Sequence, residues 1–484
     1  MERRGDEGRK RKLEASNIEG SPVAFDTMDL KNLLDRMQSQ IDGLVAINST
    51  LQARLDGQAE RQAQEVNELR EKCGVLESRC GSLERSIQVL KKDVDWTYKA
   101  PDIPRSHWIE QGHDEEYADN MERFLYEIKF EAEYIRNESG DHYCSECLNN
   151  KNAPTIILHD DALLPHFKEF ANAIQVTTSD IEIAIENIEL NPSALGILFP
   201  SMEGKASDFW MGSILFSAEN VAECYEIIAA SIRNHHTLRW LAWVDNRISS
   251  DKQAELLIES IIDNRSINTL TLNNCFNQSD INGCRALATL LTCGRPFVAL
   301  SFSRNSLSGI EDVAAALATN PQLETLRIGD NQLSDSDAGL IAEALKQNTN
   351  LQELCLLGNN SITSAGFEKI RSTIYDPSSL NAVESCNHTC YVDCVGGNVY
   401  NMTPRQRRNQ KLYKLLSTRH LDGSNARHLN GELGEDKYTI KLVPKVLHCI
   451  KLYSSDKATD SSSPLSITFE LIKTWMIPEL FEVH

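Results

Sequence analysis

The sequence lacks an apolar run long enough to span a bilayer, which takes about 20 consecutive apolar residues. Its first residues, MERRGDEGRKRKLEASN, also lack the apolar core of a secretory signal peptide. The 13 cysteines are an odd number spread over 484 residues, unlike the dense and even pattern of a small disulfide-rich secreted domain. These absences favour a reducing compartment, and we expect the protein in the cytoplasm or the nucleus.

Positive charge is also in short supply. Lysine and arginine number 49 against 70 aspartates and glutamates, which gives a formal net charge of −21. Nucleic acids and anionic membranes are bound mainly by basic surfaces that displace counterions. We therefore expect neither as a partner, and the acidic balance suits a basic protein partner better.

Motifs of catalysis and cofactor binding are missing as well. We find no G-x-S-x-G, no H-E-x-x-H, no kinase set and no dinucleotide-binding fingerprint. Gly204-Lys205 is not a phosphate-binding loop, because Phe199 stands where its first glycine belongs and Ala206 replaces the serine or threonine. The sequence predicts a protein that is not an enzyme and needs no cofactor.

A zinc site is a weaker alternative. Cys144 and Cys147 have the C-x-x-C spacing of half a site. A second half would come from a later cluster of Cys386, His388, Cys390 and Cys394. A single C-x-x-C is a weak signal, so we predict no metal here.

What the sequence does contain is a repeated pattern between Leu238 and Leu380. Each copy has apolar residues at its first, fourth and sixth positions and asparagine at its ninth. The copies begin at Leu238, Ile267, Phe297, Leu323 and Leu351, a period of about 26–30 residues that is typical of solenoid repeats. Cys275 replaces the asparagine in the second copy.

The pattern predicts a short strand followed by a helix in every copy. Apolar residues of the strand point inward, and those of the next segment fall at helical spacing, as in Ala254, Leu257, Ile258 and Ile261. The asparagine side chain can bond the backbone of neighbouring turns. Repeated strand–helix units stack into a parallel sheet inside a horseshoe with helices outside.

The copies resemble the ribonuclease-inhibitor-like class of leucine-rich repeats, most clearly at Leu323–Asn350. Weaker copies are predicted around Ile185-x-x-Ile188-x-Leu190 and over Phe209–Ile232, so that the array covers about residues 176–385. The resemblance implies an α/β leucine-rich-repeat solenoid. Together with the heptads below, the order of segments is similar to a set of coiled-coil and leucine-rich-repeat proteins encoded by diatoms, for which no activity carries over.

Heptad spacing dominates residues 26–95. The first half has apolar residues at Leu30, Leu34, Met37, Ile41, Leu44, Ile47 or Asn48, Leu51 and Leu55. The second half continues in another register, with a seam that includes Leu69, Leu76, Leu83, Ile87 and Leu90. This predicts a long coiled coil that pairs the chain as a homodimer; the alternative is a long helix folded back on the body.

Five segments follow from these patterns. Residues 1–25 are a disordered basic tail, in which Arg9–Lys12 is either a nuclear-import signal or a solvated charge run. Residues 26–95 are the coiled coil, and 96–175 a linker and helical N-terminal cap with a loop over 137–154. Residues 176–385 are the array, and 386–484 a C-terminal cap and helical region in which residues such as Trp475 and Phe481 pack on the last repeat.

Side chains between the inward positions face the inner side of the horseshoe, where a partner would meet them. The candidates for partner binding are Trp240, Val244, Asp245, Arg304, Arg327, Asp330, Glu353 and Leu357. The alternative is that the small residues among them only relieve crowding on the inner curve.

We therefore predict a non-enzymatic scaffold that dimerises through its coiled coil and binds a protein on the inner repeat face. One alternative is a regulator of a small GTPase, because repeats of this class also build Ran GTPase-activating proteins. Another is an intracellular inhibitor or sensor. The fold alone does not choose among them.

Overall fold

The computed structural model describes residues 34–55, 96–137, 144–148, 155–177, 180–276, 280–395 and 402–425, with single positions beyond these ranges. The chain divides into two units, Met1–Ser86 and Ile87–His484. The predicted basic tail and the later seam residues Leu69, Leu76, Leu83, Ile87 and Leu90 lie outside the described residues.

The first unit contains a helix over residues 34–55. Side chains on its polar side bond within the helix, as from Gln38 Nε2 to Asp42 Oδ1 at 3.0 Å. Its apolar residues are between 49% and 65% exposed, from Ile41 at the low end to Leu44 at the high end. The helix is confirmed over these residues, and its pairing into a coiled coil stays a prediction.

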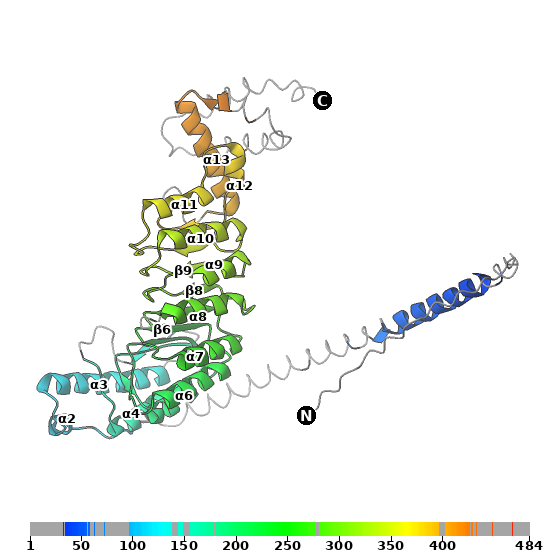
Figure 1. Cartoon of the computed structure of the whole chain (residues 1–484). Helices are drawn as coiled ribbons and strands as arrows, with labels where there is room; N and C mark the ends of the chain where they lie inside the picture. Colours follow the sequence, from blue (N-terminus) through cyan, green and yellow to red (C-terminus); the bar gives the residue numbers. More distant parts are fainter. Residues whose placement is uncertain are drawn as a thin grey trace, which may run out of the picture. The chain divides into compact units, whose positions relative to one another are not determined.

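The second unit is built on one long parallel sheet, whose strands follow one another along the array in Figure 1. Within the described residues it has nine strands in the order β1-β2-β4-β6-β7-β8-β9-β10-β11. They are β1 (Cys144–Leu148), β2 (Ile181–Glu186), β4 (Ala206–Gly212), β6 (Trp240–Val244), β7 (Thr269–Asn273), β8 (Ala299–Ser301), β9 (Thr325–Arg327), β10 (Glu353–Cys355) and β11 (Tyr391–Val392). Two short strands, β3 (Glu189–Leu190) and β5 (Leu215–Phe216), pair separately.

A helix follows almost every strand, and the helices stack along one side of the sheet (Figure 1). They are α4 (Leu164–Val176), α5 (Pro192–Met202), α6 (Val221–Asn234), α7 (Asp251–Asp263), α8 (Asp280–Thr292), α9 (Glu311–Ala318), α10 (Asp335–Gln347) and α11 (Ser364–Ile374). Polar caps fix where several begin: Ser334 and Asp337 form a reciprocal capping box at the start of α10. The strand–helix order and the parallel sheet predicted from the repeats are confirmed.

The strand register places equivalent residues of successive copies side by side. The fourth positions form one row of Leu241, Leu270, Leu300, Leu326 and Leu354. Each of these leucines is at most 1% exposed. Burying one leucine side chain contributes roughly 1.5–3 kcal/mol, so the row is a main source of cohesion between repeats.

The asparagine at the ninth position ties each repeat to the one before it. Asn331 donates from Nδ2 to the carbonyl of Phe302 at 3.0 Å, and its Oδ1 accepts from the backbone N–H of Asn305 at 2.8 Å. In the copy without asparagine, the thiol of Cys275 donates to the carbonyl of Trp243 at 3.1 Å. The predicted ladder is confirmed, and cysteine supplies its donor where the amide is missing.

The register of the weak upstream copy was predicted wrongly. Pairing of β2 with β4, and of β4 with β6, aligns Ile183 with Phe209 and Leu241 at the fourth position. The strand of that copy therefore lies at Ile181–Glu186 and not around Ile188–Leu190. The mistake arose because Ile188 and Ile214 occupy the ninth position there, so no asparagine marks the register.

The predicted loop over residues 137–154 contains a strand. β1 pairs in parallel with β2, Cys144 opposite Ile181 and Leu148 opposite Ile185, and extends the sheet by one strand. Before it come α2 (Arg105–Glu110) and α3 (Glu115–Asn137), and Gly112 turns the chain between them with a φ of +94°. The polar composition of the segment concealed an edge strand.

At the other end of the array, the short helix α12 (Leu380–Ser385) precedes β11, and α13 (Pro404–Leu421) packs against α12. Leu412, Leu415 and Leu416 are buried, as expected of an amphipathic helix. Arg407 and Lys411 are buried too, because they donate to the carbonyls of Thr389 and Asn387 at the end of the solenoid. The segments predicted to complete this cap, with Trp475, Met476, Leu480 and Phe481, lie outside the described residues.

Candidate functional site

The candidate site is the face of the sheet that carries the outward side chains of the strands, which we call the strand face. Along β7 the side chains alternate between half-buried and buried, and β6 and β10 keep the same phase at their ends. Within the described part of the array, the helices lie on the opposite side of the sheet (Figure 1). Of the predicted residues, Trp240, Val244 and Glu353 are half-buried on this face, and Arg327 is exposed.

Asp245, Arg304 and Asp330 hold the eighth position of their copies, one residue before the ladder asparagine, in a row with a special backbone conformation. Their φ angles are +57°, +60° and +53°, in the left-handed region. The same position in the neighbouring turns holds Asn274 and Gly358, also with positive φ. Glycine, asparagine and aspartate tolerate this conformation. The backbone alone thus accounts for the aspartates, whereas it does not account for an arginine at position 304.

The first half of the strand face is aromatic and acidic. Trp210 and Trp240 meet edge to face with ring centroids 6.0 Å apart, and Trp240 Nε1 donates to Thr271 Oγ1 at 3.2 Å. In the adjoining row, the register places Glu182 beside Asp208 and Asp208 beside Trp240. Two carboxylates therefore border a pair of indole rings at this end of the face.

Trp210 was not among the predicted residues. Its neighbours across the strands are Ala184 and Ala242, and a Cβ on Gly212 would lie 2.9 Å from Trp210 Nε1. Small residues around the ring thus make room for the indole. The period of the repeat could have revealed it, since Trp210 stands between the fourth and sixth positions of the copy that holds Phe209 and Met211.

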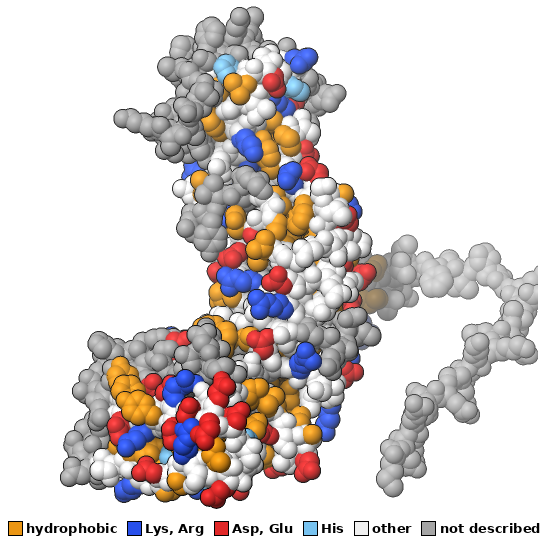
Figure 2. Space-filling view, turned by 90° about the vertical axis from the view of Figure 1, so that its left-hand side faces the viewer, with side chains coloured by type: hydrophobic (Ala, Val, Ile, Leu, Met, Phe, Trp, Pro, Cys, Tyr) orange, Lys and Arg blue, Asp and Glu red, His pale blue; other side chains and the backbone are white. Residues whose placement is uncertain are grey.

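The second half of the strand face pairs its own charges. Arg327 Nη2 lies 3.3 Å from Glu353 Oε1, and Arg304 Nε lies 3.7 Å from Asp330 Oδ2. Leu357 is 68% exposed next to them. On the side of the array shown in Figure 2, basic and acidic side chains are interspersed with apolar ones, with no single sign of charge dominating. Exposed ion pairs of this kind are worth about 0–1 kcal/mol each.

The middle of the strand face is small and polar, and its groups bond one another. Asn273 Oδ1 accepts from Ser301 Oγ and from the backbone N–H of Ser303, both at 2.9 Å. An amide engaged in this way holds adjacent strands together. The two ends of the strand face, and not its middle, therefore carry the groups that suit a partner.

The cysteines near the end of the sheet are poor nucleophiles. Burial, and then the carboxylate of Asp393, raise the pKa of Cys355 to about 11. The same causes raise the pKa of Cys394 to about 12, and burial does so for Cys390. Cysteine chemistry requires the thiolate, so these thiols do not offer an active nucleophile at neutral pH.

The two halves of the conceivable zinc site are far apart in the fold. Cys144 and Cys147 lie on β1 and Cys390 adjoins β11, and these strands form opposite edges of the nine-stranded sheet over the described residues. A single ion cannot bridge the two edges. Among the side chains that the structure describes, no group of three or more histidine, cysteine, aspartate or glutamate residues is placed to hold a metal ion.

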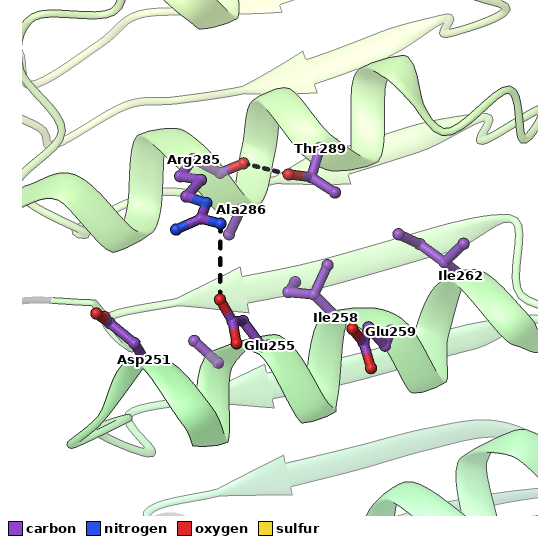
Figure 3. Close-up of a pocket in the computed structure, with 9 residues that line it drawn as sticks. Asp251, Glu255, Ile258, Glu259, Ile262, Arg285, Ala286 and Thr289 are labelled. Carbon is purple, nitrogen blue, oxygen red and sulfur yellow. Dashed lines mark hydrogen bonds and ion pairs between the residues drawn. The ribbon is translucent and has the colours of Figure 1, made fainter. Parts of the chain in front are cut away.

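A groove lies on the helix side, between α7 and α8 (Figure 3). Ala254 and Ile258 of α7 and Ala286 of α8 line it, and Arg285 reaches across to Glu255 at 3.6 Å. Small alanines at the helix contact account for the gap. The groove is separate from the strand face and gathers no set of groups suited to catalysis.

No family model matches the chain. Curated proteins do match it in part. Over 218 residues it is 24% identical to the ribonuclease inhibitor of Sus scrofa, covering 44% of this chain and 47% of the relative. Over 187 residues it is 26% identical to the ribonuclease inhibitor of Mus musculus, covering 38% of this chain and 39% of the relative.

The chain is similar to ribonuclease inhibitors. It spans less than half the length of these curated relatives. The similarity supports the leucine-rich-repeat solenoid predicted from the sequence, with a parallel sheet flanked by helices. None of the helices in the described part of the chain combines the length and the apolar character that spanning a bilayer takes.

Proposed function

We propose that the chain is a non-enzymatic scaffold that binds a protein partner on the strand face and dimerises through the heptad segment. The main support is the pair of Trp210 and Trp240 beside Asp208 and Glu182. Tryptophan is the side chain most enriched among residues that dominate binding energy. A solenoid also presents an extended face of this kind without needing chemistry of its own.

The chemistry of this end of the face suits a basic partner. Indole rings attract lysine and arginine side chains through their π faces, and carboxylates at the rim add charge complementarity. The net charge of −21 acts in the same direction over longer range. A partner segment rich in lysine or arginine is therefore the expected occupant.

The dimer half of the proposal is supported by the helix over residues 34–55. A stripe of leucine, isoleucine and methionine at heptad spacing that is half-exposed along its length is stabilised when a second helix covers it. Both parts together describe a paired array of binding faces.

An inhibitor or sensor of a protein is the second candidate. It is favoured by the similarity to proteins named ribonuclease inhibitors. The regulation of a small GTPase stays a prediction from repeat class alone, and stimulated GTP hydrolysis by a panel of small GTPases would be its test.

The experiment is affinity capture with the full chain, followed by measurement of the dissociation constant for each captured protein. We compare wild type with Trp240→Ala and with Tyr126→Ala, an aromatic side chain on α3 that is 69% exposed and far from the strand face in sequence. Binding on the strand face requires that only Trp240→Ala weakens the complex. Equal affinity of wild type and Trp240→Ala would contradict the proposal.

A further inference from the structure

We propose that the helix over residues 34–55 pairs with the same helix of a second copy of this chain, in parallel and in register, as a two-stranded coiled coil. This rests on the dimerisation that belongs to the proposed function. It adds the orientation and the number of strands, which an apolar heptad stripe by itself leaves open.

The stripe has an unbroken heptad over the described helix. Its a positions are Leu34, Ile41, Asn48 and Leu55, and its d positions are Met37, Leu44 and Leu51. Every apolar member is at least 49% exposed, so none is covered by other described parts of the chain. Isoleucine at a with leucine at d favours two parallel strands. The stripe has this combination at Ile41 and Leu44, whereas leucines hold the other apolar a positions.

Asn48 is the one polar side chain in this stripe among the described residues. In an antiparallel pair an a position faces a d position, so the Asn48 amide would be buried against Leu44 or Leu51 of the other helix. A buried amide without hydrogen bonds costs about 1–3 kcal/mol. In a parallel, in-register pair Asn48 meets the partner's Asn48, and each amide can both donate and accept.

The flanking positions do not select an orientation by charge. The e positions are Gln38, Val45 and Gln52, and the g positions are Gln40, Ile47 and Arg54. In a parallel pair, g reaches the next e of the other helix, which brings Gln40 to Val45 and Ile47 to Gln52. Neither contact joins two charges, so Asn48 is the side chain that selects the relative orientation of the two helices.

Val45 and Ile47 work against a two-stranded state. They are 59% and 58% exposed and widen the apolar stripe on both sides of Asn48. A wider stripe can be covered by more than one neighbouring helix. Asn48 opposes this because a single polar residue at an a position restricts the number of strands.

The first test is the molar mass of the full chain in solution, measured by light scattering and sedimentation equilibrium. We expect two chains per particle for wild type and for the control Ser39→Leu, which adds the same apolar volume at an outward f position. Asn48→Leu should form particles of more than two chains, alone or mixed with dimers. A variant Asn48→Leu that remains a strict dimer would overturn the role given to Asn48.

The second test is orientation. Full-length Leu34→Cys is treated with oxidised glutathione, and linked peptides are identified by mass spectrometry, which separates the new link from those of native cysteines. A disulfide between two copies of residue 34 is expected. In an antiparallel pair with Asn48 against Leu44, Met37 lies opposite Leu55 of the other helix. A link between residues 37 and 55 after mixing Met37→Cys with Leu55→Cys chains, with no link between two copies of residue 34, would overturn the parallel arrangement.

These outcomes separate the two proposals. A monomeric wild type removes both the dimer and its orientation, whereas an antiparallel dimer removes only the orientation. Binding on the strand face is decided independently by Trp240→Ala.

Discussion

On the helix side of the sheet equivalent positions hold the same kind of residue in every turn, whereas on the strand face they change from strand to strand. The buried fourth position is leucine in all five clear copies, including the copy in which Cys275 replaces the ladder asparagine. The outward position just before it is occupied by Trp240, Thr269, Ala299, Thr325 and Glu353. Packing determines the residue type at the buried fourth positions. Little in the array itself determines the residue type at the outward positions.

This difference separates residues that hold the solenoid together from residues that can recognise a partner. A buried position must match the row above and below it, since interiors are packed as densely as crystals. An outward position needs only to fit a pleated, half-covered surface. Substitutions on the two sides should therefore affect different measurements.

The largest expected effect is on the helix side, at the asparagine ladder. Asn331→Leu removes hydrogen bonds to the carbonyls of Phe302 and Ile328 and from the N–H groups of Asn305 and Leu307. The Ile328 carbonyl keeps a bond from Asn359, but the N–H groups of Asn305 and Leu307 lose their acceptor, and the variant should lower the free energy of unfolding by about 3 kcal/mol. Urea unfolding measures it, with the exposed Asn360→Leu as the matched control; equal midpoints for both variants would mean that the ladder adds little.

The second prediction concerns the loss of folding stability at acidic pH, which we expect to come from a buried histidine. Burial lowers the pKa of His235, whose side chain is 4% exposed, from 6.5 to about 4. The unfolded chain therefore binds more protons between pH 6.5 and pH 4, and stability falls as the pH drops through that window. At pH 5 the cost is about 2 kcal/mol relative to pH 7.

A pair of neighbouring substitutions tests this assignment. His235→Gln should remove that part of the loss between pH 7 and pH 5, while His236→Gln, at an exposed position, should keep it. Urea unfolding at several pH values gives the comparison. If both variants lose stability with acid as steeply as wild type, another group is responsible; the similarly lowered pKa of His388 makes it the next candidate.

The sequence predicts the buried positions of the repeats better than the outward positions of the strand face. Leucine rows and asparagines located the strands after Leu238, because both are repeated and both report burial. Where Ile188 and Ile214 replace asparagine, the register was misplaced, and Trp210 went unnoticed as a result. The positive charge of α13 also gave no indication that Arg407 and Lys411 are buried, where they donate to the carbonyls of Thr389 and Asn387.

The third prediction compares the two ends of the strand face in a binding measurement with the captured partner. Trp210→Ala or Trp240→Ala should each weaken binding by about 2 kcal/mol, roughly 30-fold, because buried aromatic anchors dominate interfaces. Arg327→Ala should cost under about 1 kcal/mol, since its exposed pair with Glu353 already occupies it. All three variants should unfold within about 1 kcal/mol of wild type. A larger loss at Arg327 than at either tryptophan would place the contact at the opposite end of the face.

The smallest expected effect on the free energy of unfolding is at Arg304. Here one side chain can affect both the stability of the array and the binding of a partner. Its φ of +60° is unfavourable for a side chain of this kind, by about 1–2 kcal/mol, and glycine adopts it freely. Arg304→Gly should therefore stabilise the fold by about 0.5–1 kcal/mol after the entropy of glycine in the unfolded chain is counted. Asp245→Gly, where the native residue already tolerates a φ of +57°, is the control and should change little. If Arg304→Gly is more stable but binds the captured partner more weakly, the strained arginine serves recognition. If Arg304→Gly is less stable, the 3.7 Å contact between Arg304 and Asp330 outweighs the backbone strain. Arg304 then belongs with the residues that hold the array together.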